Sequence, residues 1–114
     1  MQANAIRVKY ETLRSLAFGS VGAAYVGVGA AFANPVRILK VTNTTDADLL
    51  VSFDGVTDMD VVPAQSYYLY DYTSNNSLSG GIFEQASGQR LYVKEAAGAP
   101  TLGSVYVTVI FAST

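Results

Sequence analysis

Three carboxylates stand close together in the segment Asp54–Asp60, and they are the best candidates in this chain for binding a metal ion. Asp54, Asp58 and Asp60 flank a glycine that can bend the chain, and carboxylate oxygens are the ligands that Ca²⁺ prefers. The segment lacks the alternating ligand positions and the distant glutamate of an EF-hand loop. Asp54-Gly55 is also a frequent turn pair of β-hairpins. We therefore interpret the segment as a hairpin connection and predict no metal site.

Four tyrosines within six residues are the second candidate, because aromatic rings can stack on sugars or on single-stranded nucleic acid. Tyr68, Tyr70 and Tyr72 fall on one face of a predicted strand over Ser66–Thr73, and Tyr67 falls on the other. A nucleic-acid site would also need interleaved Lys or Arg, which this strand lacks. Tyrosine is a good strand former and is common at protein interfaces. We interpret these tyrosines as core or interface residues and predict no nucleic-acid partner.

The absence of Cys and His excludes most of the usual catalytic and metal chemistry. Disulfides, zinc sites built on Cys or His, and Ser-His-Asp triads all need residues that this chain does not contain. Pairs of carboxylates also serve glycosidases, but a chain of 114 residues has little room for the sugar cleft of those enzymes. We expect a non-enzymatic protein with no catalytic residue and no cofactor.

Alternation of apolar and polar residues predicts that strands position these candidates. The clearest alternation runs over Val105–Phe111, and we predict that this strand is central and buried. About seven or eight strands follow one another at intervals of roughly 8–12 residues, and no segment after Pro35 is typical of a helix. The sequence predicts an all-β fold, a single antiparallel β-sandwich (Ig-like or jelly-roll-like) over residues 1–114. Besides Val105–Phe111, the expected strands cover Ile6–Glu11, Val36–Val41, Leu49–Phe53, Ser66–Thr73, Ile82-Phe83 and Arg90–Lys94.

The N-terminal third combines a basic start with an uncharged, glycine-broken stretch over Ser15–Val36. The alternation in Ile6–Glu11 favours a half-buried strand, although a helix fits the same region. The uncharged stretch is long enough to span a bilayer, but its glycines and Asn34-Pro35 favour a strand pair or an extended arm, so we predict no membrane partner. Because glycines give up much backbone freedom on ordering, we expect residues 1–34 to form an assembly arm that stays mobile until a neighbouring subunit orders it.

Charge is distributed unevenly along the chain. Residues 1–45 hold five bases and one acid, a sum of +4, whereas residues 46–71 hold six aspartates and no base, a sum of −6. The simpler interpretation is that the aspartates form turns. The alternative is that a basic edge of one copy meets an acidic edge of the next in a head-to-tail ring. The residues predicted to form an assembly interface are Arg7, Lys9, Arg14, Tyr68, Tyr70 and Tyr72.

Turn-and-strand patterns are spread over nearly the whole chain, at Glu11–Ser20, Asn34–Ile38, Thr42–Asp48, Ser52–Asp58, Val62–Ala64, Leu69–Asn75 and Gly103–Val109. In these segments the sequence resembles the small virion structural proteins of tailed bacteriophages. The resemblance implies a subunit that decorates a capsid or forms a collar or connector ring between head and tail. It implies that the partners are copies of the chain and other virion proteins (capsid, portal or connector), that there are no catalytic residues, and that the protein enters the virion after synthesis in the bacterial cytoplasm.

Two classes of function therefore compete. The first is a structural assembly module, which is favoured because a small domain with 50% hydrophobic residues leaves apolar surface outside its core. The second is a glycan- or receptor-binding module that uses the Tyr67–Tyr72 strand or the Asp54–Asp60 loop. Ordered rings or shells would support the first class, and sugar or Ca²⁺ binding by an isolated monomer would support the second.

Overall fold

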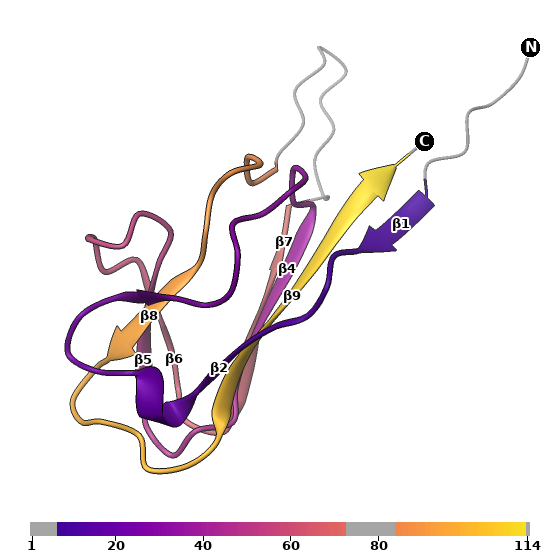
Figure 1. Cartoon of the computed structure of the whole chain (residues 1–114). Helices are drawn as coiled ribbons and strands as arrows, with labels where there is room; N and C mark the ends of the chain where they lie inside the picture. Colours follow the sequence, from indigo (N-terminus) through magenta and orange to yellow (C-terminus); the bar gives the residue numbers. More distant parts are fainter. Residues whose placement is uncertain (1–6, 73–83, 114) are drawn as a thin grey trace, which may run out of the picture.

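The computed structural model describes residues 7–72 and 84–113, which form two antiparallel sheets packed together (Figure 1). The larger sheet contains β1 (Arg7–Tyr10), β2 (Arg14–Ala17), β4 (Ile38–Asn43), β7 (Ser66–Asp71) and β9 (Ser104–Ser113). The smaller sheet contains β3 (Val26–Gly27), β5 (Leu49–Ser52), β6 (Asp60–Val62) and β8 (Tyr92–Glu95). A short 3-10 helix, η1 (Phe18–Ser20), follows β2. The predicted all-β sandwich is confirmed, with nine strands in the described residues where seven or eight were expected.

Strand β9 is the centre of the larger sheet. The strand order is β1–β9–β4–β7, with β2 also paired to β9, and the smaller sheet has the order β3–β8–β5–β6. Val105, Val107 and Val109 of β9 are completely buried against the smaller sheet, as the alternation predicted. The C-terminal end of β9 and its partner β1 project beyond the smaller sheet (Figure 1).

The glycine- and alanine-rich stretch is part of the core, so residues 14–34 do not extend from the domain as a separate arm in this structure. Val21, Val28 and Phe32 are buried in the central cluster. The stretch runs beside residues 85–95, and backbone hydrogen bonds join Val28 N–H to the Leu91 carbonyl (2.8 Å) and Phe32 N–H to the Gln89 carbonyl (2.7 Å). Small residues between the large apolar ones let the backbone lie close to its neighbours, so the chain itself supplies the contacts that we expected from another subunit.

Several local predictions can be compared with the strands directly. The loop over residues 96–103 is confirmed, and β4 begins two residues later than the Val36 expected from the sequence. The strand expected at Ile82-Phe83 lies outside the described residues. The glycine- and alanine-rich stretch, interpreted as a strand pair or an arm, contributes β2 and β3, which pair with β9 and β8 and not with each other. The bounds of β2 and β3, and the whole of β6, were not predicted, because two to four residues carry too little alternation to be recognised. In the part of the chain that the structure describes, no helix is long and apolar enough to cross a membrane.

Strands β1 and β2 are two halves of one edge strand that is interrupted by a β-bulge. Tyr10 lies opposite Ile110 and Arg14 lies opposite Val107, so four steps along the edge strand match three steps along β9. A bulge of one extra residue exchanges the faces on which the following side chains lie. Arg14, which simple alternation would place on the same outer face as Tyr10, therefore points into the sandwich.

Candidate assembly surface

The bulge directs Arg14 into a set of bonds within the chain. Its Nε donates to the Ala30 carbonyl (2.8 Å) and its Nη2 donates to the Ala31 carbonyl (2.9 Å) and to Glu11 Oε1 (2.7 Å). The guanidinium carbon also lies 5.4 Å from the centre of the Phe32 ring. Arg14 is only 9% exposed. The prediction that it forms an intermolecular interface is therefore wrong, because its donors are occupied by the chain itself.

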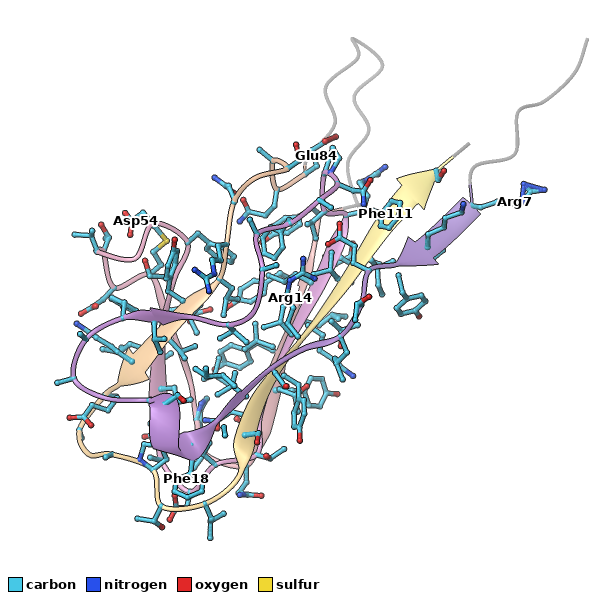
Figure 2. The ribbon with its side chains drawn as sticks, in the orientation of Figure 1. Arg7, Arg14, Phe18, Asp54, Glu84 and Phe111 are labelled. Carbon is cyan, nitrogen blue, oxygen red and sulfur yellow. The ribbon has the colours of Figure 1, made fainter. Side chains whose placement is uncertain are left out.

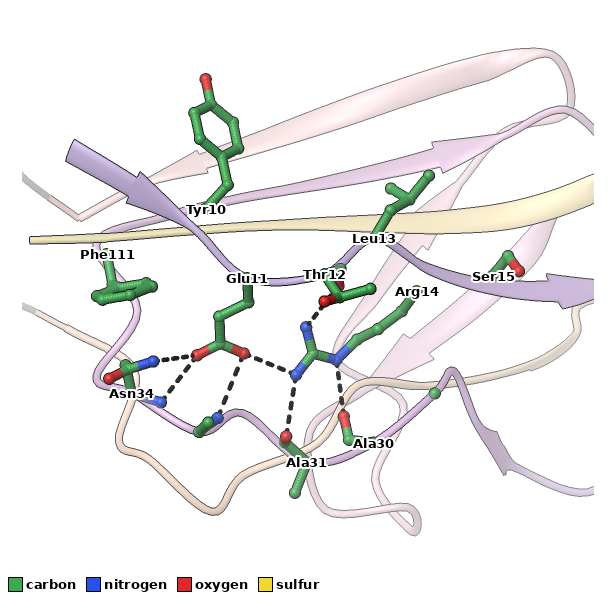
Figure 3. Close-up of a pocket in the computed structure, with 12 residues that line it drawn as sticks. Tyr10, Glu11, Thr12, Leu13, Arg14, Ser15, Ala30, Ala31, Asn34 and Phe111 are labelled. Atoms are coloured by element: carbon green, nitrogen blue, oxygen red, sulfur yellow. Dashed lines mark hydrogen bonds and ion pairs between the residues drawn. The ribbon is translucent and has the colours of Figure 1, made fainter.

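Glu11 is the second half of this Arg14–Glu11 clamp, which joins the edge strand to residues 30–34 (Figure 3). Besides the bond from Arg14, its carboxylate accepts hydrogen bonds from the Asn34 backbone N–H (2.8 Å) and the Asn34 side-chain amide (2.9 Å). Burial alone would raise the pKa of Glu11, but the hydrogen bonds from Asn34, Arg14 and the Ala33 backbone outweigh it and lower the pKa below its ordinary 4.5. The ionised carboxylate is thus the form that the fold stabilises.

Two glycines in the facing segment make room for arginine side chains. A Cβ on Gly29 would lie 2.6 Å from Arg14 Cγ, and its φ of +69° is in the left-handed region that favours glycine. A Cβ on Gly27 would lie 2.1 Å from Arg90 Cζ, and Arg90 Nε donates to the Gly29 carbonyl (2.6 Å). The Gly27-Val28-Gly29 sequence is therefore explained by close packing of two arginines.

An open hollow of about 650 Å³ lies between the edge strand and residues 29–34. We call it the edge hollow, and Figure 3 shows Phe111, Glu11, Asn34 and Arg14 around it. Both charged side chains in its lining, Glu11 and Arg14, belong to the clamp. Its lining residues are Tyr10, Glu11, Thr12, Leu13, Arg14, Ser15, Gly29, Ala30, Ala31, Ala33, Asn34 and Phe111.

The predicted tyrosine interface is divided by the fold. Tyr70 and Tyr72 are half-buried and pack against the core cluster. The Tyr70 hydroxyl donates to Asp60 Oδ2 (2.6 Å), and burial together with this carboxylate raises the pKa of Tyr70. Tyr68 stays exposed, as does Tyr67 on the opposite face. Core packing, one of the two roles that we predicted for these side chains, is thus the role of Tyr70 and Tyr72.

The aspartates of residues 46–60 all accept hydrogen bonds inside the chain. Asp54 Oδ1 accepts from the backbone N–H groups of Val56 and Thr57, both at 2.8 Å, and from the Ser52 hydroxyl at 2.7 Å. The Ser52 hydroxyl and these two N–H groups lower the pKa of Asp54. Asp58 accepts from the Tyr25 hydroxyl (2.6 Å) and pairs with Lys94 (3.2 Å). Asp54, Asp58 and Asp60 thus bond to different partners, as turn-forming and structural residues do.

The outer face of the larger sheet gathers apolar side chains that the core does not use. Val8 and Tyr10 of β1 are 69% and 67% exposed, and Tyr67 and Leu69 of β7 are 62% and 55% exposed. The registers place these four on the same face. Across the described strands of this face the charged side chains are Lys40 and Asp71. We call this the outer face, and its other apolar or aromatic members are Ile38, Tyr106 and Ile110.

Arg7 and Lys9 lie on the opposite, inner face of the projecting end of the sheet. Lys9 is opposite Phe111 and Arg7 is opposite Ser113. All four residues of β1 are exposed, so the half-buried strand that we predicted is exposed on both faces. Arg7 and Lys9 thus remain available as interface residues, whereas Arg14 is not. Glu11 and Arg14 are three residues apart, so their side chains share a face of the edge strand only because the bulge lies between them.

A scan against protein-family models, a search of curated proteins and a search of solved structures each returned no match for this chain.

Proposed function

We propose that this chain is a non-enzymatic structural subunit of a tailed-phage virion, which assembles as an oligomer at the head–tail collar or connector or as a capsid decoration. The observation that supports this proposal most strongly is the outer face. An antiparallel sheet with one face on the core normally presents alternating polar residues to water. Here the solvent face carries Val8, Tyr10, Tyr67 and Leu69, and exposed apolar patches of this kind mark protein–protein contacts.

Several charged groups bond within the chain. The clamp uses Glu11 and Arg14 to hold the edge strand, and Asp54 and Asp60 stabilise a loop and a tyrosine. These groups serve the fold. The glycan-binding alternative has less support, because Tyr70 and Tyr72 pack inward and do not form a continuous stacking platform with Tyr67.

The test is incorporation into particles. Thr108 lies on the outer face in the middle of β9, opposite Lys40, so Thr108→Arg adds a charge to the face without touching the core. We expect phage particles purified on a density gradient to contain the unaltered chain but little of the Thr108→Arg variant. Mass spectrometry of the particles measures both. The matched control is Leu102→Arg, an exposed apolar residue of the 96–103 loop. Normal incorporation of Thr108→Arg, or absence of the unaltered chain from particles, would refute the proposal.

A further inference from the structure

The projecting end of the larger sheet is a two-stranded ribbon without a covering sheet. We call it the β1–β9 ribbon; its two-stranded part consists of residues 7–9 of β1 and residues 111–113 of β9, since Ile110 also pairs with Ile38 of β4. Figure 1 shows it extending away from the smaller sheet. Two-stranded ribbons are marginally stable in water unless another layer covers them. Within the described residues no second sheet covers its inner face, which continues into the edge hollow through Phe111.

This inner face combines an apolar surface with positive charge. Phe111 and the alanines of residues 30–33 line the hollow. Lys9 and Arg7 lie on the same face of the ribbon as Phe111. A third cation, Arg37, lies beside the ribbon, because its backbone N–H donates to the Ile110 carbonyl (2.9 Å). The described carboxylates at this end are Glu84, Asp71 on the outer face opposite Ile38, and Glu11, which is paired with Arg14. An occupant of the hollow should thus be apolar at its tip and acidic beside it.

The loop between β5 and β6, residues 53–59, has that composition. Val56 is 79% exposed and Met59 is 49% exposed, and Asp54 and Asp58 stand beside them. The hydrogen bonds to Asp54 and the bond from Met59 N–H to the Val51 carbonyl (3.0 Å) fix the loop before any partner arrives. A preformed loop loses little conformational entropy on binding. The donors to Asp54 are neutral groups, so its negative charge is still available to a partner.

In the view of Figure 2, Asp54 of the loop and Arg7 of the ribbon lie on opposite sides of the molecule. We propose that copies of this chain associate head to tail, with the 53–59 loop of one copy seated in the edge hollow of the next against the inner face of its β1–β9 ribbon. Val56 and Met59 would contact Phe111, and Arg7 and Lys9 would face Asp54. Such a heterologous contact generates a ring when the rotation between copies closes. This inference deepens the proposed function and rests on it for the biological role of the ring.

The experiment uses two full-length variants that each lose one of the two surfaces. The loop variant is Val56→Ser, and the ribbon variant is Arg7→Glu with Lys9→Glu. All three side chains are exposed, so neither variant removes core packing, and Met59 is kept because its sulfur accepts a hydrogen bond from the Phe53 N–H inside the loop (3.3 Å). The matched control is Leu102→Ser, which removes an exposed apolar side chain elsewhere. Circular dichroism verifies the fold of each variant, and light scattering over a concentration series measures the oligomers.

We expect the unaltered chain and the control to form higher oligomers. Each variant alone should be at least about tenfold weaker in self-association, which corresponds to about 1.4 kcal/mol for the loss of an interface anchor. An equimolar mixture of the two variants should restore one good interface and stop at a one-to-one dimer. A mixture that stays monomeric, or variants that assemble like the unaltered chain, would overturn the head-to-tail contact. A monomeric unaltered chain would also overturn it, whereas incorporation of Thr108→Arg into particles tests the proposed function separately.

Discussion

The two halves of the edge strand, β1 and β2, both pair with β9, but they differ in how far their side chains are buried. In β2, Arg14 is buried and Leu16 packs against the core cluster. In β1, all four residues are exposed on both faces. The two halves have similar compositions, each with basic and apolar residues. The difference arises because the facing layer, residues 26–36 and the smaller sheet, covers β2 and ends before β1.

This comparison separates two roles that one strand can have. The bulge between the halves turns Arg14 inward, where it ties the strand to the facing layer, and leaves Tyr10 on the outer face. Pairing with β9 is enough to form β1, but it buries no side chain there. We infer that β2 contributes to folding and that β1 contributes surface for a partner. The predictions below test this division of roles, starting with the largest expected effect.

The strongest contrast is between a charge buried opposite β2 and a charge exposed on β1. Val107 is completely buried opposite Arg14, whose guanidinium is already bonded to Glu11, Ala30 and Ala31. Val107→Asp therefore buries a charge that has no partner of its own and should abolish soluble folding. Val8→Asp places the same charge on β1, where we expect normal yield. Soluble expression and far-ultraviolet circular dichroism measure both variants. A folded Val107→Asp variant would contradict the assignment of β9 as the central buried strand.

Loss of the clamp should be the next largest effect. Arg14→Ala leaves the Glu11 carboxylate without its cation, and breaking a buried pair in this way typically costs about 3–5 kcal/mol of stability. Arg7→Ala, on the exposed half, should change stability by less than about 0.5 kcal/mol. Urea unfolding monitored by circular dichroism measures both. The double variant Glu11→Leu with Arg14→Met should be more stable than Arg14→Ala; equal stability of Arg14→Ala and the unaltered chain would contradict a structural role for the clamp.

The sequence was sufficient for the parts of the fold where alternation is long and uninterrupted. Val105–Phe111 predicted the buried strand β9, and the turn residues predicted the hairpin at Asp54-Gly55. Alternation could not predict the bulge, because one extra residue reverses the pattern without leaving a distinctive composition. It also could not tell β1 from β2, since burial depends on how far the opposite layer extends.

The pH dependence of stability should follow the clamp. The pKa of Glu11 is lowered in the folded chain, so its stabilisation is complete above the ordinary pKa of 4.5 and is lost as the pH falls through the folded value. We therefore expect the free energy of unfolding to decrease as the pH is lowered below about 4.5. The Glu11→Gln variant should show a smaller decrease, because it lacks the group that titrates. Urea unfolding at pH 7 and at a series of lower values measures it. A slope unchanged by Glu11→Gln would show that other carboxylates account for the acid sensitivity.

The smallest expected effect concerns the acidic loop, which resembles β2 in bonding its polar groups within the chain. Asp54 accepts hydrogen bonds from its own loop, Asp58 pairs with Lys94, and Asp60 accepts from Tyr70, so Ca²⁺ would have to displace bonds that are already made. A ligand that binds the native state at a hundred times its dissociation constant adds about 2.7 kcal/mol. We expect millimolar Ca²⁺ to leave the melting temperature unchanged, in the unaltered chain and in Asp58→Asn alike. A rise of several degrees that disappears in Asp58→Asn would contradict this and would restore the loop as a candidate binding site, and with it the glycan- or receptor-binding alternative.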